Sequence, residues 1–137
     1  MNIKEYIIAA QKLLIDTDIP VFPVFTGKNE QEMLNFLAEN GGERSRAVCL
    51  VPESATLRTS NTAAVFDKFE LACYYATLYS NADLDAAKCY LDDLEKIIRA
   101  LHCSRIKNTH TLRCGSPAFS LVRNSAGLLI FRIPFIL

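Results

Sequence analysis

Glycine is scarce in this chain of 137 residues, which contains only five of them, and tryptophan is missing altogether. The sequence has no G-x-G-x-x-G, no G-x-x-x-x-G-K-[ST] and no G-x-S-x-G motif. Phosphate-binding loops and nucleophile elbows depend on glycine, because their backbone must turn sharply or approach a ligand closely. The scarcity of glycine therefore argues against nucleotide-dependent enzymes.

An excess of charge of either sign is also missing, since 15 basic residues face 15 acidic ones. The cluster of basic residues at Arg105, Lys107, Arg113 and Arg123 has none of the interleaved aromatic residues that single-strand binders use. We therefore expect no nucleic acid among the partners.

No secretory signal pattern opens the chain, because charged residues interrupt its first apolar segment.

Long apolar runs are absent too, so the sequence offers no segment of ~20 apolar residues for a membrane helix. The densest run is GLLIFRIPFIL at 127–137, which is too short and contains Arg132. We expect no membrane association. An apolar chain end with no polar tail instead predicts burial in the fold or in a partner.

Four possible metal ligands lie close together in the sequence, namely His102, Cys103, His110 and Cys114. Their spacing lacks the C-x2-4-C knuckle of zinc sites, so a polar connection is the preferred interpretation. A thiol nucleophile at Cys103 or Cys114 is the alternative, because basic residues lie nearby, but no third orienting residue can be assigned. We expect no catalytic residue, no cofactor and no small-molecule substrate.

The five cysteines are widely spaced and odd in number, which favours a reducing cytosol as the compartment in which the chain folds.

Hydrophobic periodicity predicts a single mainly antiparallel α+β domain over residues 1–137, in the order α–β–α–β–β–α–β–β. The polar stretch 53–63 is interpreted as a loop or as the flexible tip of a long hairpin. The predicted helices are 2–15, 29–42 and 81–102 (its core about 83–102), and the predicted extended segments are 21–25, 46–52, 65–79, 118–123 and 128–137.

Two elements have the clearest patterns. The far half of strand 65–79 is apolar on both faces, which predicts a central strand covered on both sides. Helix 81–102 has one apolar stripe and one charged face. The stripe comprises Leu84, Ala87, Leu91, Leu94, Ile98 and Leu101, and the charged face, which we interpret as solvated, includes Asp92, Asp93 and Glu95.

The chain end is interpreted as the return strand of a hairpin that turns at 124–127. Alternation places Phe131, Ile133, Phe135 and Leu137 on one face. Pro134 has no N–H for a ladder, so it predicts a sheet edge or a bulge. We expect the beginning of this strand to pair within the subunit and its last residues to be covered by a neighbour.

The order of these elements resembles one known family. An amphipathic helix is followed by a strand ending in AVCLVPES, by a polar hairpin tip, by FELACYYATLYS running straight into NADLDAAKCYLDDLEKIIRAL, and by closing strands that end in FRIPFIL. This layout resembles the tail terminator and tail completion (head–tail joining) proteins of long-tailed bacteriophages and prophages. The resemblance covers most of the chain in element order, and the passage 69–101 carries most of it.

The resemblance implies a virion structural protein without catalytic residues, made in the bacterial host cytoplasm. It implies a homo-oligomeric ring, often hexameric, at the head–tail junction, with other tail or connector proteins as partners. Rings use heterologous contacts, so the hairpin tip and the chain end are the candidate contact patches. The candidate contact residues are Leu57, Arg58, Thr59, Asn61, Phe131, Arg132, Pro134, Phe135 and Leu137. The alternatives are a non-viral oligomeric α+β interaction module, or a small metal- or thiol-dependent enzyme that uses residues 102–114.

Overall fold

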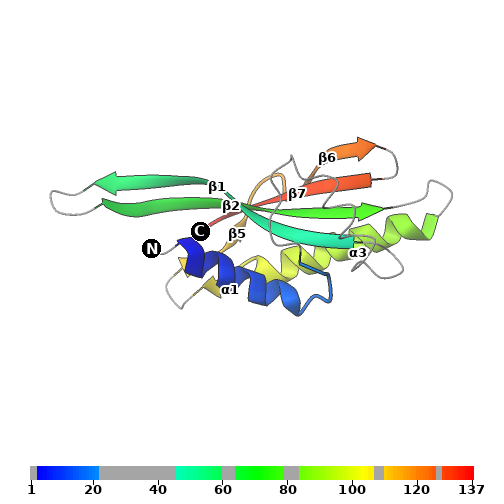
Figure 1. The fold of residues 1–137 in the computed structure, drawn as a ribbon, viewed down its shortest axis with the longest axis horizontal. Helices are drawn as coiled ribbons and strands as arrows, with labels where there is room; N and C mark the ends of the chain where they lie inside the picture. Colours follow the sequence, from blue (N-terminus) through cyan, green and yellow to red (C-terminus); the bar gives the residue numbers. More distant parts are fainter. Residues whose placement is uncertain (1–2, 22–45, 60–63, 79–83, 107–109, 126–127) are drawn as a thin grey trace.

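The computed structural model of the chain describes residues 3–21, 46–59, 64–78, 84–106, 110–125 and 128–137. These residues form two helices and an antiparallel five-stranded sheet in the order β1-β2-β7-β5, with β6 also paired to β7 (Figure 1). A separate two-stranded ladder joins β3 to β4. The bounds are α1 Ile3–Ile15, β1 Arg46–Thr59, β2 Ala64–Leu78, α3 Leu84–Leu101, β3 Arg105–Ile106, β4 His110–Thr111, β5 Arg113–Cys114, β6 Ser120–Ser125 and β7 Leu128–Ile136.

Both helices lie on the same face of the sheet, which we call the helix face (Figure 1). Helix α1 buries a stripe formed by Tyr6, Ala10 and Leu14, which are four residues apart in sequence. It ends where Thr17 donates its N–H and its hydroxyl to the carbonyl of Leu14, and Asp18 adopts a positive φ of 62°. This ending turns the chain toward the sheet, so that the carbonyl of Pro20 accepts the N–H of Val48.

Strand β2 is the central strand that its sequence predicts, paired with β1 on one side and with β7 on the other. Cys73 and Tyr75 are buried on the helix face, and their neighbours Ala72 and Ala76 are buried on the opposite face, which we call the outer face. The prediction that the far half of this strand is covered on both sides is therefore confirmed. An apolar strand with both faces buried gives the sheet its rigid middle.

Strand β1 is longer than predicted, because it continues past Pro52 to Thr59. Shifts of register between Pro52 and Ser54, and between Thr56 and Leu57, let the ladder pass the proline and go on. The stretch 53–63 is therefore a strand as far as Thr59 and not a loop, which agrees with the hairpin interpretation. The paired arms of β1 and β2 continue beyond the ends of the helices (Figure 1).

Strand β7 contains Pro134 but lies at neither an edge nor a bulge, so that prediction was wrong. The strand pairs with β2 without any shift of register, and β5 and β6 pair along its other side. The Pro134 carbonyl accepts the Gly115 N–H on that other side. The nitrogen of Pro134 points the same way, into the interruption between β5 and β6, where no ladder donor is needed.

Several other predictions fall outside this description or need correction. The predicted helix 29–42, and the predicted strand 21–25 after Val21, lie outside the described residues. The short strands β3, β4 and β5 occupy a stretch that was predicted to be a polar connection. In α3 the buried stripe runs through Asp93, Leu94, Ile97 and Leu101, whereas Leu91 is half exposed.

Candidate interaction surface

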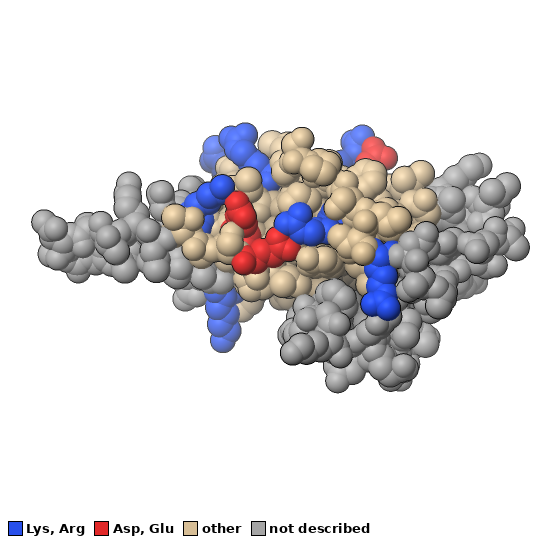
Figure 2. Space-filling view, turned by 90° about the horizontal axis from the view of Figure 1, so that it is seen from above, with Lys and Arg blue, Asp and Glu red and all other residues tan. Residues whose placement is uncertain are grey.

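The outer face of the sheet carries a hydrogen-bonded cluster drawn from three adjacent strands. Arg132 of β7 binds Glu53 of β1 through two nitrogens, with Nε 3.0 Å from Oε1 and Nη2 in contact with Oε2. Tyr74 of β2 donates its hydroxyl to the same Oε1 at 2.9 Å. Figure 2 shows acidic and basic side chains gathered side by side near the middle of this face. The cluster therefore links β1, β2 and β7 through side-chain hydrogen bonds at the surface.

The electrostatics of this cluster favour its charged form. The hydrogen bond from Arg132 holds the pKa of Glu53 below its ordinary value. The hydrogen bond to Glu53 in turn raises the pKa of Arg132. Burial, and next the hydrogen bond to Glu53, raise the pKa of Tyr74, so the phenol stays protonated and keeps donating. The Arg132–Glu53 pair is thus charged at neutral pH and already compensated.

A second pair of charges continues the cluster along β2. Lys68 lies 3.0 Å from Glu70, and the Ser54 hydroxyl donates to the other carboxylate oxygen of Glu70 at 2.9 Å. The hydrogen bond from Lys68, and next that from Ser54, lower the pKa of Glu70. Glu53 and Glu70 therefore each have their own cation.

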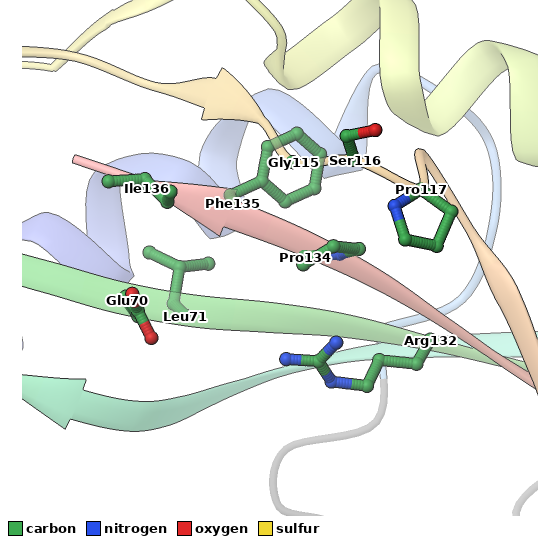
Figure 3. A pocket seen from close by; sticks show the side chains of 9 residues that line it. All are labelled: Glu70, Leu71, Gly115, Ser116, Pro117, Arg132, Pro134, Phe135 and Ile136. Atoms are coloured by element: carbon green, nitrogen blue, oxygen red, sulfur yellow. The ribbon is translucent and has the colours of Figure 1, made fainter.

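A pocket of about 200 Å³ lies beside this cluster (Figure 3). Register places four of its lining residues on the outer face, namely Glu70, Arg132, Pro134 and Ile136. The rest of the lining comes from Leu71, Phe135 and the segment Gly115–Ser116–Pro117, whose Ser116–Pro117 bond is cis. On the outer face the pocket thus combines two charged side chains with Pro134 and Ile136, whereas the side chains of Leu71 and Phe135 project to the buried helix face.

Gly115 lets the segment after β5 lie directly against β7. A Cβ at this position would lie 3.0 Å from Cγ of Pro134, closer than side chains normally pack. The Gly115 N–H donates to the Pro134 carbonyl at 2.8 Å. A side chain at this position would therefore require Pro134 to shift by a few tenths of an ångström.

The edge strand β6 carries the largest group of exposed apolar side chains on the described part of the sheet. Phe119 just before it is 40% exposed, Leu121 is 49% exposed and Val122 is 50% exposed. The register shifts between Leu121 and Arg123, which adds a bulge to this edge. Phe119 meets Phe131 edge to face with ring centroids 6.0 Å apart. An apolar edge of this kind is a feature that proteins normally cover.

A buried ion pair links α3 to the sheet on the helix face. Asp93 is 1% exposed, and its Oδ1 lies 2.5 Å from Nη1 of Arg46. Its Oδ2 accepts the Tyr75 hydroxyl at 2.5 Å. Burial, and next this hydrogen bond, raise the pKa of Tyr75. The interpretation of Asp93 as part of a solvated face was wrong, whereas Asp92 is exposed and Glu95 pairs with Arg99 as expected on a surface.

The His/Cys candidates do not form a metal centre among the residues that the structure describes. His102 and Cys103 are exposed, and Nδ1 of His102 accepts the Cys114 N–H at 2.9 Å. Burial raises the pKa of Cys114, whose Sγ lies 3.5 Å from the Ala118 carbonyl. A raised pKa is the opposite of what a thiolate nucleophile needs. His110 begins β4, and its side chain lies outside the description.

The candidate contact residues divide into three groups. Leu57, Arg58 and Thr59 belong to the hairpin arm of β1, with their side chains outside the description, as is all of Asn61. Arg132 and Pro134 line the outer-face pocket.

Phe131 and Phe135 are buried in the subunit's own core, and Leu137 packs against it and donates its N–H to Phe69. The expectation that a neighbour covers the chain end therefore needs correction. The side chains of Phe131 and Phe135 have little or no surface left for a partner, and the half-exposed Ile136 was not among the candidates.

Comparison with known proteins adds no assignment, since no protein-family model and no curated protein matches the chain. Among the described residues, no helix has both the length and the apolar character that crossing a membrane would require. The described surface therefore has to be interpreted from its own chemistry. It consists of an extended hairpin, a compensated polar cluster with a pocket, and an apolar edge.

Proposed function

We propose that this chain is a structural subunit that assembles with copies of itself into a ring. More specifically, we propose a tail terminator or tail completion subunit that closes the tail tube at the head–tail junction of a long-tailed phage or prophage. Its place would then be the virion, and its partners would be other copies and neighbouring tail or connector proteins.

The β1–β2 hairpin is the observation that carries this proposal. Its strands are 14 and 15 residues long, and their register continues to the pair Thr59–Ala64. The arms extend past the helices that cover the rest of the sheet (Figure 1). Because an isolated two-stranded ribbon is at best marginally stable in water, a long projecting hairpin favours a role in contact with another subunit.

Two further features support assembly. The sheet ends in two unlike edges, because β1 exposes a mainly polar segment from Pro52 to Thr56, whereas β6 exposes apolar side chains. Unlike patches on one chain favour head-to-tail contacts, which close into a ring when the rotation permits. The order of β2, α3 and the closing strands also follows the layout on which the resemblance to tail terminators rests.

The direct test is the mass of the purified chain in solution. We expect size-exclusion chromatography with light scattering to show a closed oligomer, and negative-stain electron microscopy to show rings. A strict monomer at high concentration and physiological salt would contradict the proposal. A closed two-fold dimer would favour a non-viral interaction module instead.

A variant with a shortened hairpin sharpens this test. Thr56 pairs with Lys68, so residues 57–67 can be replaced by Asn-Gly, which forms a two-residue hairpin turn. We expect the variant to fold, because the described core residues lie outside 57–67, and to lose the oligomer. If the shortened protein still forms the wild-type oligomer, the hairpin is not part of the interface. Genes for a tail-tube or tape-measure protein beside this one would support the phage assignment.

A further inference from the structure

An extra residue in β1 marks the base of the β1–β2 hairpin. Pro52 pairs with Leu71 and Ser54 pairs with Glu70, so Glu53 lies between two ladder pairs without an opposite residue in β2. An extra residue of this kind is a β-bulge, which bends its strand, increases the local twist and changes the aim of a side chain. The direction in which β1 continues into the hairpin is therefore set at Glu53.

The support from a third strand ends at the same level. Strand β7 pairs with β2 as far as Ile136, which lies opposite Glu70, and the Leu137 N–H donates to the Phe69 carbonyl. Farther out, the described parts of β1 and β2 pair only with each other (Figure 1). Because two-stranded ribbons twist more than larger sheets, the ladder alone constrains the arms less than the strands behind them.

The bulge also separates two polar side chains by function. Leu71 belongs to the core on the helix face, so Pro52 opposite it projects to that face, and strict alternation would place Ser54 there too. Ser54 instead lies opposite Glu70 and donates to its carboxylate on the outer face. Glu53 and Ser54 therefore both project to the outer face, where Ser54 bonds within the hairpin and Glu53 bonds outside it.

The contacts of Glu53 run back along the sheet. Tyr74 and Arg132 lie opposite each other in the β2–β7 ladder, and β1 meets this level at Cys49, before the bulge. Arg132 donates to Glu53 from Nε at 3.0 Å and from Nη2, and the Tyr74 hydroxyl donates at 2.9 Å. Ladder hydrogen bonds run across the strands. The contacts of Glu53 instead connect the base of the hairpin to residues farther back in the sheet.

We propose that Glu53 is a positioning residue, which fixes the direction of the β1–β2 hairpin by binding Arg132 and Tyr74. With these contacts made, the arms are presented to a neighbouring copy in one orientation. Without them, the arms pivot at the bulge, and the apparent affinity falls with the fraction of subunits in the competent orientation. The inference rests on the proposed function, because it takes the hairpin as the element that contacts the neighbour.

Glu53→Ala tests the inference by removing both contacts of the carboxylate. On dilute subunits, we expect amide hydrogen exchange in 54–59 and 64–69, measured by mass spectrometry, to become about twofold to fivefold faster. Exchange in 71–78 should stay as in wild type, because these residues lie behind the bulge. Self-association, measured by analytical ultracentrifugation, should weaken by about the same factor.

Glu95→Ala is the matched control. Glu95 is also an exposed carboxylate bound to an arginine, Arg99, but both residues lie on α3, and the hairpin arms extend past the helices (Figure 1). We expect this variant to match wild type in the exchange of the arms and in self-association.

A charge exchange distinguishes positioning from a direct contact between Glu53 and a neighbour. Glu53→Arg and Arg132→Glu each bring like charges together, so each alone should behave like Glu53→Ala. The double variant restores an ion pair with its ends exchanged, and both measurements should return toward wild type. A direct contact with a neighbour would not be restored in this way.

Two results would overturn the inference and leave the proposed ring standing. One is wild-type exchange of the arms in Glu53→Ala, and the other is a double variant that is as impaired as either single variant. A monomeric wild type would instead contradict the proposed function. The exchange measurement on dilute subunits would then still decide whether Glu53 holds the arms.

Discussion

Two clusters of the same chemical composition lie on opposite faces of this sheet. On the helix face, Tyr75 donates to Asp93, which pairs with Arg46. On the outer face, the adjacent Tyr74 donates to Glu53, which pairs with Arg132. Each consists of an arginine, a carboxylate and a tyrosine, but Asp93 is almost fully buried whereas Glu53 is exposed to solvent.

The difference in burial changes what each cluster contributes. A buried charge that loses its partner stays desolvated without compensation, which is strongly destabilising. Because Asp93 lies on α3 and its partners Arg46 and Tyr75 lie on the sheet, the inner cluster constrains how α3 packs on the sheet. An exposed pair is compensated by water and salt when it breaks, so the outer cluster adds little stability. Its contribution is to order the rim of the pocket. The same three functional groups therefore serve the core on one face and a surface on the other.

The largest effect should come from removing the buried carboxylate. In Asp93→Ala, the Arg46 guanidinium and the Tyr75 hydroxyl both lose the carboxylate that binds them. We expect a loss of about 3–5 kcal/mol in the free energy of unfolding, measured by urea denaturation. Asp92→Ala is the matched control, because Asp92 is exposed and adjacent in sequence. This substitution should lower the free energy of unfolding by less than about 0.5 kcal/mol. Equal losses in the two variants would mean that burial does not distinguish them.

The two tyrosines allow a comparison within one strand. Tyr75→Phe removes a hydrogen bond to a buried carboxylate, which should cost about 1.5–3 kcal/mol. Tyr74→Phe removes the equivalent bond on the outer face, where water can replace the hydroxyl, and should cost about 0.5 kcal/mol or less. Both variants keep the ring, so packing changes little. A larger loss in the free energy of unfolding for Tyr74→Phe than for Tyr75→Phe, measured by urea denaturation, would contradict this comparison.

The sequence was sufficient to predict the elements whose patterns are set locally. The far half of strand β2 is apolar at successive positions, and helix α3 has an apolar stripe that includes Leu94 and Leu101. These patterns predict the type and the approximate ends of both elements. The hairpin of β6 and β7 follows from turn residues between two apolar runs. In each case the signal lies within the segment itself.

The features that could not be predicted depend on residues far apart in sequence. Asp93 resembles its neighbours Asp92 and Glu95 in sequence, and its burial depends on Arg46, 47 residues away, and on Tyr75. The polar arm of β1 has little strand character of its own, and pairing with β2 extends it past Pro52. The outer cluster likewise needs three strands in one register, because Glu53 and Arg132 are 79 residues apart.

The outer ion pair should have the smallest effect on stability, and that effect should depend on salt. Glu53→Gln keeps the shape of the side chain but removes the charge that Arg132 binds. We expect a loss of about 0.2–1 kcal/mol at low ionic strength that shrinks as salt is added. Lys68→Met, which removes the partner of Glu70, is the surface control and should behave in the same way. A loss that is large and independent of salt would place Glu53 in the same class as Asp93.

The pH dependence of this small effect has a defined sign. Because the Arg132 hydrogen bond lowers the pKa of Glu53 from its ordinary value of 4.5, the folded state binds the proton less readily than the unfolded chain. The stabilisation is therefore complete above about pH 4.5 and is lost as pH falls through the lowered pKa of the folded state. Wild type and Glu53→Gln should accordingly differ most near neutral pH and converge in acid. A stability difference that grows as the pH falls would show that Arg132 does not hold Glu53 in its charged form.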